Sequence, residues 1–149
     1  MDQMVSAQPG FIPKMAGFLM NLCIWGAMIF VDHLLDYAYV ALMRDLTLDE
    51  THLAKSSFER HSDDGGVNIN SYQADNGWFA DVGFQQAIKE TNQTLTFCAV
   101  GAHHQNGIVK RQIKELTLIS CTLFLHAKCH WPKYVTTMMW PFALKEAAY

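Results

Sequence analysis

The apolar run from Met15 to Val31 constrains the fold of this chain more than any other feature. It reads MAGFLMNLCIWGAMIFV, and Asn21 is its one polar side chain. Its length is close to the lower limit of about 17 residues for a helix that spans a membrane. Gly17 and Gly26 weaken such a helix, and the second half suits a buried strand equally well. We therefore predict that Met15–Val31 is not one continuous helix and that its second half is a strand.

The composition is that of a packed domain. The chain has 149 residues, of which 50% are hydrophobic and 17% charged, and its mean hydropathy is +0.03. This size favours a single domain over residues 1–149. The first residues, MDQMVSAQPGFIPK, lack the short basic region of a secretory leader. The less favoured alternative is a small membrane-anchored protein that uses Met15–Val31 as its transmembrane segment.

Charge and cysteine spacing limit the classes of partner and site. Residues 1–109 hold five basic and twelve acidic side chains, whereas residues 110–149 hold six basic and two acidic. Contact with a polyanion is therefore expected only in the C-terminal quarter. The widely spaced Cys23, Cys98, Cys121 and Cys129 form no C-x-x-C pair, so we expect a reducing compartment and no disulfide framework. Cys121, His126, Cys129 and His130 are the nearest approach to a zinc cluster, and ordinary helix packing is favoured for them because a structural zinc site usually draws ligands from two elements.

Local patterns predict strands first and then helices alternating with strands. Residues 1–14 contain Pro9, Gly10 and Pro13 and predict a short strand remnant followed by a loop. Asp32–Asp36 is a hairpin turn between a strand that ends near Val31 and a strand at Tyr37–Met43. The other expected elements are a helix over residues 46–61 capped by Thr47, a strand at Val67–Ala74, a helix at Phe79–Thr91, a strand at Thr94–Val100, a long amphipathic helix at Ile108–Lys128 and a mostly helical Val135–Tyr149.

Two motifs stand out within this order. Asp75-Asn76-Gly77 follows one predicted strand, and Gln105-Asn106-Gly107 opens the long helix. With the strand Met28–His33 and the helix around Glu50–His61, they make nearly the whole chain resemble the integrase catalytic core of Copia-type retrotransposon polyproteins. The resemblance implies an α/β, ribonuclease H-like fold with a mixed central sheet and helices on both faces. Because only Met1 precedes Asp2, we expect the first strand of that fold to be truncated.

The resemblance also implies a reaction and a metal. The family transfers phosphoryl groups in DNA integration, with two Asp and one Glu holding Mg²⁺ or Mn²⁺. Carried over by position, Asp75 is the second acid and Asp2 the first, and both are expected metal ligands. Asp32, after the second strand, is the rival for the first acid.

The third acid is where the chain departs from the family. The family has Glu-Arg two residues after Gln-Asn-Gly, whereas this chain has Lys110-Arg111. An ammonium repels a divalent cation and offers it no lone pair. The catalytic set is therefore Asp2, Asp75 and Lys110 in place of Glu. We expect a catalytically dead remnant, a pseudoenzyme, and the alternatives left open are an active integrase-type enzyme and a site that keeps its metal.

The remaining expectations concern partners. The candidate nucleic-acid-binding residues are Asn76, Gln105, Asn106, Lys110, Arg111 and Lys114. Three cations would give only weak, salt-sensitive DNA binding, and a solvated helix face is the alternative. No small-molecule substrate is expected, a homodimer is left open, and a functional integrase would act in the nucleus.

Overall fold

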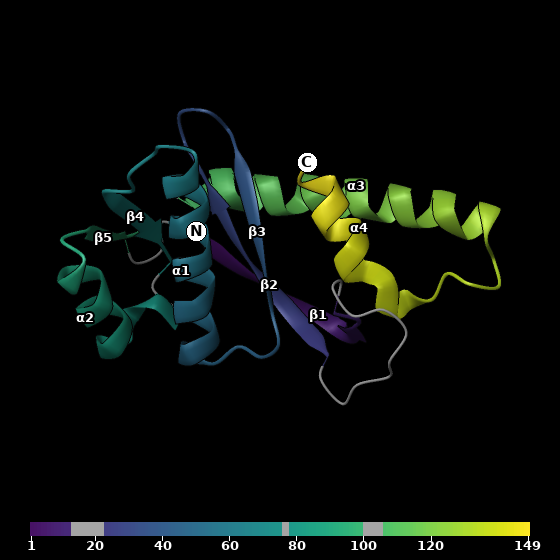
Figure 1. The fold of residues 1–149 in the computed structure, drawn as a ribbon, viewed down its shortest axis with the longest axis horizontal. Helices are drawn as coiled ribbons and strands as arrows, with labels where there is room; N and C mark the ends of the chain where they lie inside the picture. The colour runs from purple at the N-terminus through teal and green to yellow at the C-terminus, as the bar shows by residue number, and fades with distance from the viewer. Residues whose placement is uncertain (13–22, 76–77, 100–105) are drawn as a thin grey trace.

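The computed structural model describes residues 1–12, 23–75, 78–99 and 106–149. Its elements run in the predicted order of three strands, a helix, and then strands alternating with helices (Figure 1). They are β1 (Asp2–Gly10), β2 (Ile24–Val31), β3 (Ala38–Met43), α1 (Leu48–Asp64), β4 (Ser71–Ala74), the 3-10 turn η1 (Trp78–Ala80), α2 (Val82–Glu90), β5 (Thr94–Phe97), α3 (Gly107–His130), the 3-10 turn η3 (Thr137–Met139) and α4 (Trp140–Ala147).

The strands form two hydrogen-bonded sheets. β1, β2 and β3 make an antiparallel sheet in which Asp2 lies opposite Ile29. β4 and β5 make a parallel pair. The amino group of Met1 donates to the carbonyl oxygen of Gln73 at 2.7 Å and so joins the edge of β1 to β4. The sequence predicted one mixed sheet. In the described residues, the five strands instead form these two separate hydrogen-bonded sheets.

Helices cover both faces of the antiparallel sheet, as predicted (Figure 1). On one face Phe30 of β2 stacks on Phe58 of α1, with ring centroids 4.3 Å apart. On the other face Ile29 packs with Leu116 of α3 and Leu144 of α4. Alternate residues of β2 therefore supply two separate cores, because successive side chains of a strand point to opposite faces.

The first strand is longer than the sequence predicts. The expected short remnant is wrong, since β1 runs for nine residues and includes Pro9 and Gly10. Its register to β2 shifts between Val5 and Gly10, and such an irregularity accommodates a proline that cannot donate to the ladder. Trp140 of α4 also donates to the carbonyl oxygen of Gln8 at 3.0 Å. The shifted register and the bond from Trp140 allow β1 to continue through Pro9 and Gly10, although these residues usually end a strand.

The central hairpin agrees with the prediction. β2 pairs with β3, and Asp32 closes the turn by accepting from the backbone of Leu34 and Leu35. Ile24–Val31 is a strand, so Met15–Val31 is not one continuous helix. The first half of that run, residues 15–22, lies outside the described residues. Within the part of the chain that the structure describes, no helix is long and apolar enough to cross a membrane.

The helices are predicted better than the later strands. Thr47 caps α1, as predicted, and accepts from the backbone nitrogen of Glu50 at 3.5 Å. The strand expected at Val67–Ala74 shrinks to Ser71–Ala74, because the N–H of Val67 bonds back to Ser62 and closes the end of α1. The helix expected from Phe79 starts at Val82, since Asp81 caps it.

Candidate functional site

Asp2 lies at the start of β1, beside the beginning of α3. One carboxylate oxygen accepts from the backbone N–H of Gln3 at 2.9 Å, and the other accepts from Nδ2 of Asn106 at 3.3 Å. Asn106 precedes α3, is only 2% exposed and makes no capping bond with its side chain. Its amide is therefore directed to Asp2 and not to the helix end.

Asp75 follows β4 directly and faces the same helix. Nζ of Lys110 lies 3.6 Å from Oδ2 of Asp75, with the two side chains 43% and 31% exposed. Asn106 and Lys110 are four residues apart, so they lie about one helical turn apart on the same side. The first turn of α3 thus contacts both acids, one through an amide and the other through an ammonium.

The electrostatics of Asp2 reflect this crowding. Burial is the largest influence and raises the pKa of its carboxyl, and the negative charge of Asp75 raises this pKa further. The N–H of Gln3 and the charge of Lys110 oppose the change but do not cancel it, so the pKa stays above its ordinary value. Two carboxylates that disfavour each other's charge suit a divalent cation, and Lys110 already supplies part of the charge that such a cation would bring.

The donor set fits a metal poorly. Mg²⁺ needs oxygen ligands in near-octahedral geometry and uses one or two carboxylates with waters and phosphates. Asp2 and Asp75 could supply two such oxygens, but the ammonium of Lys110 lies beside Asp75, and the described residues place no third acid with them. Among the described residues, no group of three His, Cys, Asp or Glu side chains could hold a metal ion. The described residues of this site therefore do not fit a metal ion.

The other candidate nucleic-acid residues are spread along α3. Arg111 is 61% exposed, and its guanidinium lies 3.8 Å from Asp36 and 3.6 Å from Glu115. Lys114 is exposed. Asn76 and Gln105 lie outside the described residues. The structure therefore brings Lys110 to the acids and leaves Arg111 and Lys114 on the outer surface of the helix.

Asp32, the rival first acid, has a different environment. The N–H groups of Leu35 and Leu34 hold the pKa of its carboxyl below the ordinary value, and His33 adds to this effect. Its carboxylate thus serves the hairpin turn, whereas the carboxyl of Asp2 interacts with both Asp75 and Lys110. Of the two acids, Asp2 is the one whose pKa is raised by the negative charge of Asp75.

Sequence reasoning missed a buried polar cluster between α1 and β4. Oε1 of Glu59 accepts from Nζ of Lys55 at 2.8 Å and from the hydroxyl of Tyr72 at 3.0 Å, and it also accepts from the amide of Gln93. Burial alone would raise the pKa of Glu59, but these donors outweigh it and leave the pKa below its ordinary value. The four-residue spacing of Lys55 and Glu59 is a local signal for one contact, whereas nothing local predicts Gln93.

Comparisons with known proteins identify the fold. Neither a protein-family model nor a curated protein sequence matches the chain. Among solved structures, the magnesium complex of the HTLV-2 integrase catalytic core domain in trimeric form matches with a TM-score of 0.58 and 14% identity, over 99% of this chain and 81% of that one. Its dimeric form gives a TM-score of 0.57 and 14% identity, over 99% and 82%.

A third match is a larger protein. A structure of the simian T-cell lymphotropic virus intasome with the PP2A regulatory subunit B56 gamma matches with a TM-score of 0.61 and 18% identity. The match covers 96% of this chain and 46% of that one, so the chain spans less than half of its length. These similarities show that the chain shares the fold of integrase catalytic cores.

Proposed function

We propose that the chain is an integrase-type catalytic-core domain of ribonuclease H-like arrangement, that it derives from a Copia-type retrotransposon, and that it is catalytically inactive. The observation that carries this proposal is the position of Asp2, Asp75 and Lys110 around the first turn of α3. The fold shared with integrase cores supports the class. The motifs at Asp75 and Asn106 support the Copia-type origin.

Inactivity follows from the charge of Lys110. In the family that the chain resembles, divalent metal ions stabilise the attacking and departing oxygens of the phosphoryl transfer. Here the ammonium occupies one side of Asp75 and offers no ligand. Both carboxylate oxygens of Asp2 already accept hydrogen bonds, one from the side chain of Asn106 and one from the N–H of Gln3, so a metal ion would compete with both donors. The site keeps two acids but not the charge that would attract a cation.

Weak DNA binding is the activity that remains in this proposal. Lys110, Arg111 and Lys114 lie on the first turns of α3, within the basic quarter of the chain. Arg111 is already paired with acidic neighbours, so it would exchange one anion for another. A homodimer remains a prediction, and the dimeric and trimeric forms of the similar HTLV-2 cores are consistent with it.

Magnesium affinity tests the proposal. We expect calorimetric titration of the wild-type chain to show very weak Mg²⁺ binding and no strand transfer on a DNA substrate. Lys110→Glu removes the ammonium and restores a third carboxylate, and we expect it to bind Mg²⁺ at least about tenfold more tightly, equivalent to about 1.4 kcal/mol.

Two control variants separate ligation from charge. Lys114→Glu makes the same change of charge at an exposed position one helical turn farther along α3, and should change Mg²⁺ affinity much less than Lys110→Glu does. Lys110→Met removes the ammonium without adding an oxygen ligand, and its affinity should fall between those of the wild type and Lys110→Glu. Tight Mg²⁺ binding by the wild type would contradict the proposed inactive site.

A further inference from the structure

Two histidines near the end of α3 lie outside the candidate site. His126 and His130 are four residues apart on the last turns of the helix, and both are exposed. The sequence favoured ordinary helix packing for them and for Cys121 and Cys129, but all four side chains are exposed, so packing does not account for them. Residues four apart on a helix lie on the same side, so the two imidazoles face solvent together.

The rings of His126 and His130 are close enough to bind one metal ion. Their centroids are 4.4 Å apart, and their planes are tilted by 41°. A metal ion bound to a ring nitrogen at about 2.1 Å lies roughly 3.2 Å from the ring centroid. Two rings with this centroid separation therefore subtend nearly a right angle at the ion. Neighbouring ligands in square-planar and octahedral sites make such an angle, whereas the tetrahedral ligands of structural zinc need rings that are farther apart.

A hydrogen bond prepares His130 to bind a metal. Its Nδ1 lies 3.0 Å from the carbonyl oxygen of His126, and because a carbonyl oxygen can only accept, Nδ1 carries the proton. In the neutral ring, Nε2 then keeps its lone pair. Histidines that bind metals commonly donate their other ring N–H to a carbonyl or a carboxylate. The bond thus determines which nitrogen of His130 is available to a metal ion.

The surroundings of the pair favour a cation. α3 ends at His130, and the helix dipole places partial negative charge at this end. The ammonium of Lys128 donates to two carbonyl oxygens of the following loop, at 2.8 and 2.7 Å. Helical periodicity also places Lys128 on the other side of the helix from the two rings. Lys110 is about 24 Å from His126 along α3 (Figure 1). Neither ammonium is therefore held against the exposed faces of the imidazoles.

We propose that His126 and His130 bind one divalent transition-metal ion of the Ni²⁺ and Cu²⁺ type. Imidazoles suit these ions, whereas Mg²⁺ prefers oxygen. The described residues supply no third His, Cys, Asp or Glu ligand, so water completes the coordination. The ion links two successive turns and stabilises the end of α3, because the unfolded chain does not hold the two rings together. This inference goes beyond the proposed function and does not depend on it.

Calorimetric titration of the full chain with Ni²⁺ tests the pair. Ni²⁺ is the probe because, unlike Cu²⁺, it does not oxidise free thiols. We expect saturable binding, and His126→Ala and His130→Ala should each weaken it at least about tenfold, because a single imidazole loses the advantage of chelation. The double variant should bind little more weakly than either single variant. Both positions are exposed and alanine favours a helix, so these variants should keep the fold.

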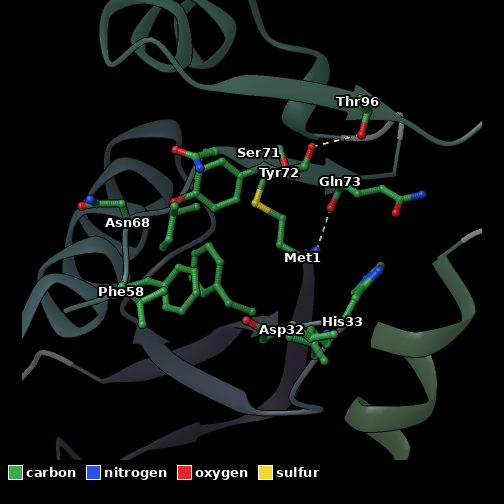
Figure 2. A pocket seen from close by; sticks show the side chains of 15 residues that line it. Met1, Asp32, His33, Phe58, Asn68, Ser71, Tyr72, Gln73 and Thr96 are labelled. Atoms are coloured by element: carbon green, nitrogen blue, oxygen red, sulfur yellow. Dashed lines mark hydrogen bonds between the residues drawn. The ribbon is translucent and has the colours of Figure 1, made fainter. Parts of the chain in front are cut away.

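His33→Ala and Cys129→Ser are the matched controls. His33 lies in the hairpin turn beside the groove between β2 and β4, so its loss removes an imidazole that has no helical neighbour (Figure 2). Cys129 precedes His130 in α3 and is exposed, so its loss removes the adjacent thiol. Both variants should bind Ni²⁺ with the affinity of the wild type.

Trp131 supplies a second readout, which reports where the ion binds. Its ring centroid lies 5.7 Å from that of His130. Bound Ni²⁺ should quench the fluorescence of Trp131. The variant Trp131→Phe should lose this quenching and keep the calorimetric affinity.

Four results would overturn the proposal. They are the absence of saturable Ni²⁺ binding, unchanged affinity in His126→Ala and His130→Ala, equal quenching in the wild type and Trp131→Phe, and loss of binding in Cys129→Ser. The last result would make the thiol a ligand in place of the paired imidazoles.

Discussion

Lys110 and Asp75 form an ion pair between the first turn of α3 and the end of β4, with 3.6 Å between Nζ and Oδ2. Both side chains are partly exposed, at 43% and 31%. Water screens such a pair, so Lys110→Ala should change the free energy of unfolding by no more than about 1 kcal/mol. Urea denaturation of both forms measures the difference. A loss well above that limit would show that Lys110 stabilises the fold, and it would weaken the proposal that Lys110 stands in place of a third acid.

Asp2 and Asp32 should respond oppositely to loss of their charge. The folded-state pKa of Asp2 is raised, mainly by burial, so stability declines as pH rises from the unfolded value of about 3.9 through the folded pKa. Asp2→Asn should therefore raise the urea midpoint at pH 7 and have little effect near pH 3.

Asp32→Asn is the matched control for this experiment. The pKa of Asp32 is lowered by the N–H groups of Leu35 and Leu34, so its contribution to stability is present above about pH 3.9 and is lost as pH falls. Its substitution should lower the midpoint at pH 7. The same direction of change for both variants would contradict the different environments of the two acids.

Local sequence signals predicted the elements whose contacts are also local. The Asp32 turn, the Thr47 cap and the periodicity of α3 each involve residues close in sequence, and each element formed where predicted. The prediction of a short first strand was wrong because β1 is also held by Trp140, which donates to Gln8 from 132 residues away in sequence. Nothing near Pro9 reports that contact.

In the candidate site, too, the residues in local motifs were predicted and the contacts between distant segments were not. Asp75, Asn106 and Lys110 were selected from their motifs, and the structure brings them to Asp2. The buried amide of Asn106 bound to Asp2 was not predicted, because it depends on how α3 meets β1. The two separate sheets were also unexpected, since hydrogen-bond partners across a sheet are decided by tertiary packing.

Glu59→Gln tests the buried cluster between α1 and β4. Lys55 has a side chain only 6% exposed, so neutralising Glu59 leaves a buried ammonium without its carboxylate. We expect a loss of about 3 kcal/mol in the free energy of unfolding. The double variant Lys55→Met, Glu59→Gln should recover part of this loss, because the unpaired charge is gone. If the double variant were less stable than Glu59→Gln, the ammonium would not be the source of the cost.

Gly10→Ala tests the packing of β1 against α4. A Cβ at Gly10 would lie 2.6 Å from Nε1 of Trp140 and would also meet the ring of Pro141. We expect a loss of about 1–3 kcal/mol, as for other overpacked sites, measured by thermal unfolding. Gly107→Ala is the control, since a Cβ there meets nothing within 4 Å and alanine favours the start of α3. Equal effects at both positions would show that glycine flexibility matters more than close approach.

Salt dependence tests DNA binding by α3. If Lys110, Arg111 and Lys114 contact three phosphates, a plot of log affinity against log salt for a labelled duplex should have a slope of about −3. Lys114→Ala should reduce the magnitude of this slope by about 1, because Lys114 is exposed and makes a full phosphate contact in this proposal. Arg111→Ala should reduce it less, because Asp36 and Glu115 already attract its guanidinium.

Lys133→Ala is the control for that measurement. Lys133 is exposed beyond the far end of α3, and its loss changes the net charge by the same amount. An effect confined to Lys114 and Arg111 would locate the contact on the first turns of the helix, where Lys110 also lies. Equal effects of Lys114→Ala and Lys133→Ala would instead indicate general attraction between the basic quarter of the chain and DNA, and would remove the argument for an ordered contact at the start of α3.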